Sequence, residues 1–324
     1  ICTGCLKLRT MALNLDLETM QRVVRSLDPS WRAEGFGRLE GGSTEVCWID
    51  VAGAGAQPLV LKIYPDEPAW LPAKEALAAG WLKGLVPAVP TWLRVDASRA
   101  ILPRRFAVLT WLPGRPLRHW LRDPGIGSAY RQTGELLRRL HAIPMQAYGY
   151  IRGDGIETPR ATNAEYMAGA FEDVFRRFRD LGGDADLGRR LERLAGESFD
   201  LLTESSGPVF CHDDFHQGNL LALLGPDGDL RLSGLIDFGN ARAADGLFDL
   251  AKALFCCAHE DGRSRQPLLD GYGPIDHPEP ERALRLYTLF HRASMWCWLT
   301  RLGHEAAAED GPGGLLRDLR EMAR

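Results

Sequence analysis

Lysine is scarce in this chain. Only five of the 39 lysine and arginine residues among its 324 residues are lysines, and the formal net charge is −4. A protein that binds nucleic acid usually carries a clustered basic face. The composition gives no indication of such a face, so we expect no nucleic-acid partner.

Long apolar runs are also missing. The sequence has no stretch of 18 apolar residues, which predicts that no helix spans a membrane and that no membrane is a partner. The N-terminus lacks the apolar stretch of a signal peptide, so we expect a cytoplasmic protein. The chain begins at Ile1, but Met11 is a better protein start. Residues 1–10 are therefore expected to be an upstream remnant outside the fold.

The chain does not have the cysteine pattern of a disulfide framework. Its seven cysteines are Cys2, Cys5, Cys47, Cys211, Cys256, Cys257 and Cys297. Their odd number and scattered spacing argue against disulfides, and reduced thiols fit a cytoplasmic protein. Cys2 and Cys5 have the spacing of half a zinc site, but no second CxxC motif follows. Cys256 and Cys257 lie in an apolar stretch and are interpreted as core residues.

Strand patterns are concentrated in the first third of the chain, and helix patterns follow. We expect strands at residues 46–51, 58–64 and 106–112, and helices at 14–27 and 72–85. After a break at Pro113-Gly114, we expect helices at 129–141, 165–178, 187–202 and 283–302, with strands at 208–211 and 230–236. The order predicts a strand-rich part, a hinge and a helical remainder.

One nine-residue segment concentrates polar side chains. Residues 211–219 read CHDDFHQGN, in which Asp214 is five residues before Asn219. Asp237-Phe-Gly follows 23 residues after Asp214. A metal site, a phosphoryl-transfer loop and an ordinary polar turn are all compatible with this segment taken alone.

The order of the upstream residues favours phosphoryl transfer. A glycine-rich turn ends at Thr44, Lys62 lies on an expected strand, and Glu75 lies on an expected helix. Transfer from a nucleotide needs backbone N–H groups over the phosphates, a lysine on the phosphates and a carboxylate to fix that lysine. It also needs a base, together with hard oxygen ligands for Mg²⁺. Each feature is weak evidence alone, but the chain presents all of them in the order that the kinase fold uses.

These motifs resemble those of the aminoglycoside phosphotransferase and choline kinase family, which are small-molecule relatives of the protein kinases. The matches are His212–Leu220 and Ile236–Gly239, and Asp245–Ala251 is similar to the stretch that follows them. The resemblance extends over nearly the whole chain from about residue 14. It implies an α+β, bilobal, protein-kinase-like fold. A small antiparallel-sheet lobe (residues 11–112) would bind the nucleotide, and a larger helical lobe (residues 113–324) would bind the substrate.

The resemblance also implies roles for individual residues. Asp214 would be the catalytic base, and Asn219 and Asp237 would hold Mg²⁺. Lys62 would contact the phosphates of ATP or GTP, with Glu75 as its ion-pair partner. The remaining nucleotide-binding residues would be Gly41, Gly42, Ser43 and Thr44 over the nucleotide, and the backbone of residues 109–112, including Leu109 and Trp111, at the base.

One position departs from the family pattern. The residue before the catalytic aspartate is often glycine in the family, and here it is Asp213. The spacing to Asn219 identifies Asp214 as the base, and Asp213 would be a neighbour able to raise the pKa of that base.

Several nearby residues are expected to have structural roles. Asp249 would be a buried hydrogen-bond partner of the loop that contains Asp214 and Asn219, and His212 would brace that loop. His141 would pack against, or cap, its helix. Trp296 and Trp298 are expected in the core.

Two other functions remain as alternatives. His212, Asp214 and His216 have the residue types of a zinc triad, but a zinc hydrolase would leave Asp237 and Lys62 without a role. A nucleotide-binding pseudoenzyme that regulates a partner is the second alternative, although every catalytic residue is present. A protein kinase is disfavoured, because the segment after Asp237-Phe-Gly is too short to dock a peptide.

The substrate is expected to be a small hydroxylated molecule, and an aminoglycoside-type antibiotic is favoured. Residues 113–324 carry a net charge of −6, which suits a cationic substrate. The carboxylates expected to face it are those of Glu260, Asp261, Asp270 and Asp276. Choline, homoserine, hydroxylysine, sugar and macrolide kinases share the same motifs and remain open.

Overall fold

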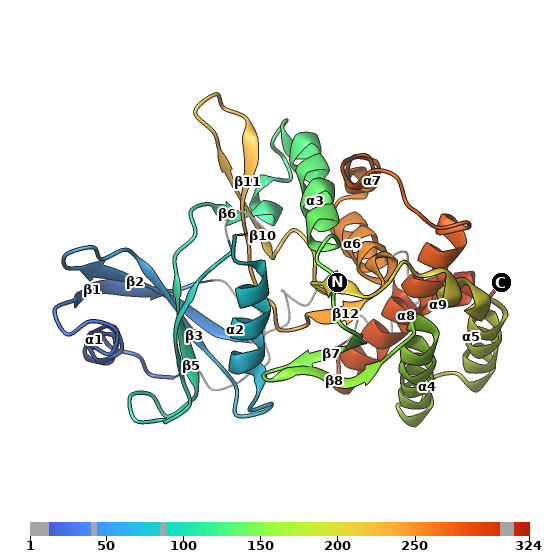
Figure 1. Ribbon diagram of the computed structural model, residues 1–324, viewed down its shortest axis with the longest axis horizontal. Coiled ribbons are helices and arrows are strands. Elements are labelled where there is room, and N and C mark those ends of the chain that lie inside the picture. The colour runs from blue at the N-terminus through green and yellow to red at the C-terminus, as the bar shows by residue number, and fades with distance from the viewer. Residues whose placement is uncertain (1–12, 40–43, 85–88, 305–313) are drawn as a thin grey trace.

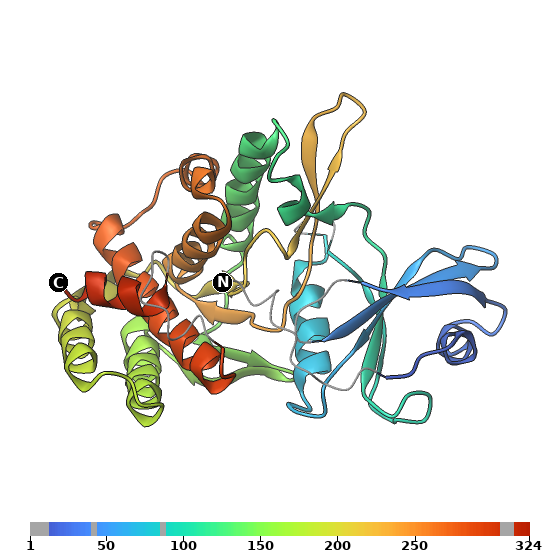
Figure 2. The same ribbon diagram turned by 180° about the vertical axis from the view of Figure 1, so that it is seen from behind.

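The computed structural model of the protein describes residues 13–39, 44–84, 89–304 and 314–324. They form two lobes, a small one built on an antiparallel sheet and a larger one dominated by helices (Figures 1 and 2). The glycine-rich turn residues Gly41, Gly42 and Ser43 and the expected remnant 1–10 lie outside the described residues. No helix among the described residues is long and apolar enough to cross a membrane.

The small lobe is a five-stranded sheet with one helix on each side (Figure 1). Its strand order is β1-β2-β3-β5-β4, and every neighbouring pair is antiparallel. The strands are β1 (Arg32–Arg38), β2 (Glu45–Ala52), β3 (Leu59–Ile63), β4 (Trp92–Asp96) and β5 (Phe106–Thr110), and the helices are α1 (Leu17–Arg25) and α2 (Leu71–Leu82). Side chains alternate between the two faces of a strand. Leu61 and Ile63 therefore pack toward α1, while Lys62 between them faces the side of α2.

Helix α2 packs against apolar residues of both lobes, because its Leu71 lies against the small-lobe cluster of Tyr64, Ala107 and Leu109. Ala78, Ala79 and Leu82 belong to the large apolar cluster of the helical lobe, whereas α1 packs into a separate cluster of the small lobe. Both views show α2 between the sheet and the helical lobe (Figures 1 and 2). Residues on α2 are therefore placed by both lobes.

The large lobe contains most of the helices. They are α3 (Ile126–Leu140), α4 (Asn163–Asp180), α5 (Ala185–Glu197), α6 (Gly246–Glu260), α7 (Arg265–Tyr272), α8 (Pro280–Arg301) and α9 (Leu315–Met322). One small sheet joins β6 (Arg115–Pro116), β10 (Leu220–Leu224) and β11 (Leu230–Leu235). A second joins β7 (Tyr148–Arg152), β8 (Gly155–Arg160), β9 (Val209–Cys211) and β12 (Arg242–Ala244). These short strands carry the loops on which the functional residues lie.

Some expected elements end elsewhere. The strand expected through residue 112 ends at Thr110, where a proline and a glycine soon follow. The helix expected over 187–202 starts earlier, because Asp184 caps it by accepting the Leu187 N–H. It stops at Glu197, and a 3₁₀ segment (Phe199–Glu204) continues the chain. Trp296 is a core residue as expected, whereas Trp298 is only partly buried. The division at residues 112 and 113 stays a prediction.

Candidate active site

The polar segment 212–219 forms a buried loop between two strands. It leaves β9 at Cys211 and enters β10 at Leu220, and every residue in it is buried. The Ile236 N–H donates to the Asn219 carbonyl at 3.0 Å, which brings the Asp237-Phe-Gly segment beside the end of the loop. We call residues 212–219 the catalytic loop, the role that the sequence predicts.

A carboxylate from α6 holds the start of the catalytic loop. Asp249 Oδ2 accepts the His212 N–H at 2.7 Å, and Asp249 Oδ1 accepts the Asp213 N–H at 2.9 Å. Burial acts to raise the pKa of Asp249, but hydrogen bonding from His141 and the backbone brings it below its ordinary value. The predicted role of Asp249 as a buried partner of the loop is therefore confirmed.

The two expected structural histidines have backbone and side-chain partners. His212 Nε2 lies 3.1 Å from the Ile236 carbonyl, and burial lowers the pKa of this imidazole. A neutral ring donating its Nε2–H to that carbonyl would brace the loop, as expected. His141 follows the last residue of α3, and its Nδ1 lies 2.8 Å from the Tyr272 hydroxyl.

The proposed base and one proposed metal ligand are in contact. Asn219 Nδ2 donates to the Asp214 carbonyl at 2.9 Å and to Asp214 Oδ2 at 3.2 Å. His216 Nε2 lies 3.8 Å from the same carboxylate oxygen. Burial acts to lower the pKa of His216, but the Asp214 carboxylate raises it overall. The side chains of Asp214 and Asn219 are thus fixed relative to each other.

Lys62 joins the small lobe to the Asp237-Phe-Gly segment. Its Nζ lies 2.8 Å from Glu75 Oε1 and 3.1 Å from Asp237 Oδ1. Burial acts to lower the pKa of Lys62, but the charges of Asp237 and Glu75 raise it above its ordinary value. Burial raises the pKa of Glu75, and the charge of Lys62 reduces this increase. The Tyr64 hydroxyl donates to Glu75 Oε2 at 2.8 Å. The ion pair expected between Lys62 and Glu75 is present.

The remaining nucleotide-site residues lie on the small lobe. Thr44 immediately precedes β2, Leu109 is buried in β5, and Trp111 follows β5 with 36% of its surface exposed. The Trp111 N–H donates to the Pro58 carbonyl at 3.3 Å. These positions are compatible with the expected roles, which remain predictions.

Asp213 is engaged by cations that the sequence analysis missed. Its Oδ1 lies 3.1 Å from Lys252 Nζ on α6, and its Oδ2 forms an ion pair with Arg242 on β12. The expectation that Asp213 acts mainly as a neighbour of Asp214 overlooked this pairing. Lys252 is one of the five lysines, which was the one signal available.

The zinc alternative finds no support in the geometry. Among the described residues, the side chains whose ligand atoms converge are His141, Cys211 and Asp249, not the predicted triad. Burial raises the pKa of the Cys211 thiol well above its ordinary value, which disfavours the thiolate that zinc needs. The Asp249 oxygens already accept backbone N–H groups, so this cluster is a hydrogen-bonded packing site.

The acidic residues expected to receive a cationic substrate are mostly engaged elsewhere. Asp261 accepts the Tyr130 hydroxyl at 3.0 Å and pairs with Arg263, and Asp270 lies 3.3 Å from Arg131. Asp276 lines a separate small cavity near His277. Glu260, at the end of α6, helps raise the pKa of His216 in the catalytic loop, although Asp214 contributes more.

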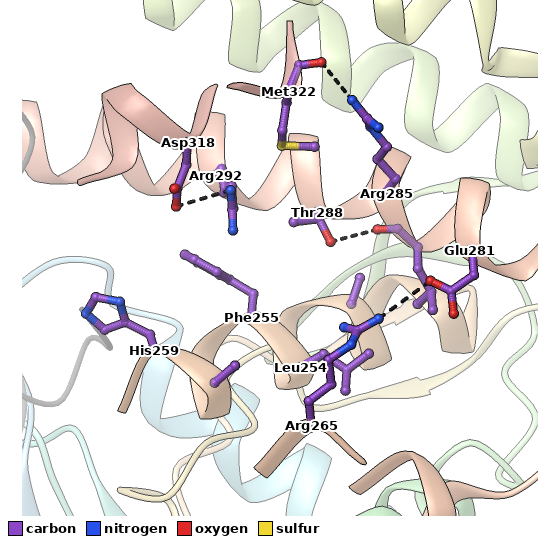
Figure 3. A pocket seen from close by; sticks show the side chains of 13 residues that line it. Leu254, Phe255, His259, Arg265, Glu281, Arg285, Thr288, Arg292, Asp318 and Met322 are labelled. Carbon is purple, nitrogen blue, oxygen red and sulfur yellow. Dashed lines mark hydrogen bonds and ion pairs between the residues drawn. The ribbon is translucent and has the colours of Figure 1, made fainter. Parts of the chain in front are cut away.

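A cavity of about 410 Å³ lies between α6, α8 and α9 (Figure 3). Its charged residues include Arg265, which lies 3.5 Å from Glu281, and Arg292, which lies 3.1 Å from Asp318. Leu254 and Ala258, which line it, fall roughly opposite the helix face bearing Asp249 and Lys252, at about 100° per residue. The cavity therefore lies mainly behind α6 as seen from the catalytic loop.

Comparison with protein families gives one match over most of the chain. A family model described as phosphotransferase enzyme family matches residues 37–286. This range contains every described residue to which the sequence analysis assigned a role at the site.

Curated proteins with related sequences are kinases. N-acetylmuramate/N-acetylglucosamine kinase of Caulobacter vibrioides is 30% identical over 195 residues, covering 58% of this chain and 50% of that protein. Choline/ethanolamine kinase of Mus musculus is 28% identical over 202 residues, covering 58% and 47%. Streptomycin 3''-kinase of Streptomyces griseus is 29% identical over 217 residues, covering 64% and 74%. The chain thus spans about half the length of the first two.

Solved structures with the same fold include aminoglycoside phosphotransferases. The structure of aminoglycoside phosphotransferase APH(4)-Ia superposes with a TM-score of 0.70 at 16% identity, covering 95% of this chain and 100% of that one. The complex of APH(2")-IIIa with GDP and kanamycin gives a TM-score of 0.68 at 16% identity, covering 94% and 99%. At these identities the likeness confirms the bilobal, protein-kinase-like fold predicted from the sequence.

Proposed function

Because the chain belongs to the phosphotransferase enzyme family, we propose that it transfers the terminal phosphoryl group of ATP or GTP to a hydroxyl group of a small molecule. One observation carries the proposal: Lys62 Nζ contacts both Glu75 and Asp237, while Asp214 is held by Asn219 on the adjoining loop. Residues 11–112 would then bind the nucleotide and residues 113–324 the acceptor. A cytoplasmic location, where nucleotides are abundant, belongs to the same proposal.

Asn219 and Asp237 are the residues proposed to hold Mg²⁺. The amide nitrogen of Asn219 donates hydrogen bonds to Asp214, so the amide oxygen of Asn219 is the atom suited to bind a cation. The Asp237 side chain is 42% exposed, although Lys62 contacts one of its oxygens. Carboxylate and amide oxygens are the ligands that Mg²⁺ prefers. When bound, the ion would neutralise charge on the phosphates.

The other residues would act directly on the reactants. Lys62 would hold the phosphates, and Glu75 would fix the lysine ammonium in position. Asp214 would accept the proton of the acceptor hydroxyl, a step worth about 10²–10⁴-fold in rate. In the same proposal, Thr44 covers the nucleotide, and Leu109 and Trp111 lie at its base.

An aminoglycoside-type antibiotic is our first candidate acceptor. A streptomycin kinase is among the curated relatives, and hygromycin B and kanamycin are bound in structures with the same fold. The net charge of −6 on residues 113–324 also suits a cationic acceptor. On this proposal the protein would confer antibiotic resistance.

A sugar is the second candidate acceptor. Asp261 and Asp270 are already paired with arginines, which weakens the case for a strongly cationic molecule. An N-acetylmuramate/N-acetylglucosamine kinase is the relative at 30% identity. A neutral or acidic sugar would not need those carboxylates.

The test is ADP and GDP release by the purified protein with Mg²⁺ across a panel of acceptors. The panel would hold aminoglycosides, N-acetylated amino sugars, choline, homoserine, hydroxylysine and a macrolide, with Asp214→Ala as the control. Release stimulated by one class, and lost in the variant, would support the proposal and name the acceptor. Bound nucleotide with no stimulation by any compound would favour the pseudoenzyme.

A further inference from the structure

Asp213 adopts a backbone conformation that is uncommon for residues other than glycine. Its φ angle is +51°, in the left-handed region, and the residue is 2% exposed. Aspartate tolerates this region better than most residues, but such a conformation is still unfavourable and persists only where surrounding contacts enforce it. A glycine would adopt the same angle without strain. The contacts of Asp213 with its neighbours are therefore expected to hold this conformation.

Every polar group of Asp213 has a partner on a neighbouring element. Its N–H donates to Asp249 on α6, and its carbonyl accepts from Lys252 on the same helix. Its carboxylate contacts Lys252 through one oxygen and Arg242 on β12 through the other. Asp214 follows immediately in the chain. The residue before the proposed base is thus fixed from two sides.

Arg242 is itself fixed by its surroundings. Its Nη1 donates to the Tyr166 hydroxyl at 3.0 Å, and its guanidinium carbon lies 4.9 Å from the centre of the Phe248 ring. A planar guanidinium held by stacking and hydrogen bonding loses little conformational entropy when it pairs with a carboxylate. Arg242 therefore offers Asp213 a rigid anchor.

The charges of Asp213, Arg242 and Lys252 do not cancel one another. Lys252 and Arg242 carry two positive charges, and Asp213 carries one negative charge. Burial acts to lower the pKa of Lys252, but the carboxylates of Asp213 and of Asp214 raise it. The ammonium of Lys252 therefore interacts electrostatically with the carboxylate of the proposed base, Asp214. Removing Asp213 would leave one buried cation, Lys252, and one partly buried cation, Arg242, beside the loop without their shared carboxylate.

We propose that Asp213, Arg242 and Lys252 form a positioning cluster that clamps the catalytic loop to α6 and β12 and so holds Asp214 in place for phosphoryl transfer. The effect on catalysis rests on the proposed function. The attachment of the loop to α6 and β12 rests on the geometry alone. Asp213 is a positioning residue, because it acts through the backbone of Asp214.

The experiment compares four variants with the wild-type protein. Asp213→Asn keeps the shape but removes the charge, Asp213→Gly removes strain and side chain together, and Lys252→Met removes the ammonium. The double variant Asp213→Asn/Lys252→Met has the same net charge as the wild type, so it is expected to fold even where the single variants do not. Asp96→Asn is the matched control, since Asp96 is a buried carboxylate paired with Arg94 in the small lobe.

Two readouts separate the clamp from general stability. Hydrogen exchange of the peptide covering residues 209–221 should become about tenfold faster in every cluster variant, while β2 and β3 keep their protection. With an acceptor from the panel, kcat should fall about tenfold or more, and KM for the nucleotide should stay within about threefold. The double variant should not recover kcat, because the cluster acts as a unit. The Asp96→Asn protein should match the wild type in both readouts.

The outcomes are distinct. Unchanged exchange in the loop would overturn the clamp, whether or not the protein is active. Faster exchange with wild-type kcat, or a double variant with wild-type kcat, would overturn the positioning role. An inactive wild-type protein would reject the proposed function, and with it the catalytic consequence, while the exchange data would still decide the clamp.

Discussion

The contacts of Lys62 predict how its substitution would change nucleotide affinity and the free energy of unfolding. Lys62 is 7% exposed, and its ammonium compensates the buried carboxylate of Glu75. Lys62→Met should weaken nucleotide binding at least about tenfold, which is about 1.4 kcal/mol. It should also lower the free energy of unfolding by about 3–5 kcal/mol, because Glu75 is left buried and unpaired. Calorimetry and denaturant titration would measure both effects.

The matched control for that variant is Lys83→Met. Lys83 is exposed just after the same helix, α2. The Lys83→Met protein should bind nucleotide as the wild type does. Its free energy of unfolding should fall by less than about 0.5 kcal/mol. Equal nucleotide affinity in the two variants would contradict a phosphate-binding role for Lys62.

The burial of Lys74 predicts that the free energy of unfolding depends on pH. Lys74 is fully buried, its Nζ lies 3.4 Å from the centre of the Tyr150 ring, and no hydrogen-bond partner lies within reach among the described residues. Burial, helped by the charge of Arg242, lowers the pKa of Lys74 from 10.5 to about 6. Between these values the unfolded chain binds a proton that the folded protein does not, so stability falls as the pH falls toward 6.

Replacing Lys74 with methionine should remove this dependence. The melting temperature of Lys74→Met should exceed that of the wild type, and the difference should grow as the pH is lowered from about 9 to about 6. Melting curves at several pH values would measure it. A difference that stays constant over this range would show that Lys74 titrates normally in the folded protein.

At the scale of elements, α6 organises the site more than any other segment. It supplies Asp249 to the backbone of the catalytic loop and Lys252 to Asp213, and Glu260 lies at its end. This helix is not predicted by the sequence pattern. Its residues from Leu247 to Leu254 are buried on all sides, so the amphipathic periodicity that identifies a surface helix is absent.

Asp249→Asn tests how α6 holds the loop. Asparagine offers one carboxamide oxygen where the aspartate uses two, so one of the N–H groups of His212 and Asp213 loses its acceptor. The loss should be about 1–3 kcal/mol in the free energy of unfolding, together with a lower kcat. Asp173→Asn, at an exposed position on α4, should leave both values unchanged. Wild-type kcat in Asp249→Asn would mean that the loop does not depend on α6.

Local patterns predicted some parts of the site and not others. The catalytic-loop spacing and the Lys62–Glu75 pair follow from motifs, and the structure contains that pair. Arg242 and Lys252 were missed because they lie 29 and 39 residues beyond Asp213, and no pattern at their own positions marks them. The φ angle of Asp213 was not predictable either, because tertiary contacts enforce it.

At the scale of the whole molecule, the two lobes meet through α2 and the Lys62–Asp237 contact. These residues are 175 positions apart, so their approach is a property of the complete fold. A nucleotide with Mg²⁺ that bound between the lobes would stabilise the folded protein, by about 2.7 kcal/mol at a concentration 100 times Kd. The melting temperature should therefore rise with ATP or GTP and Mg²⁺.

Removing the metal tests this coupling. Chelation of Mg²⁺ should abolish most of the rise in melting temperature, and so should Asn219→Ala or Asp237→Ala. Comparing ATP with GTP under the same conditions would give the donor preference. A rise of equal size with and without Mg²⁺ would contradict a metal-dependent nucleotide site.

The most direct test of the central claim is the detection, by mass spectrometry, of a phosphorylated acceptor made by the wild-type protein and by Asp214→Ala. Calorimetry would confirm that both proteins bind the nucleotide. The account predicts a product with the wild type and at least about a hundredfold slower formation with the variant, at similar nucleotide affinity. A variant that forms the product at the wild-type rate would contradict the assignment of Asp214 as the base.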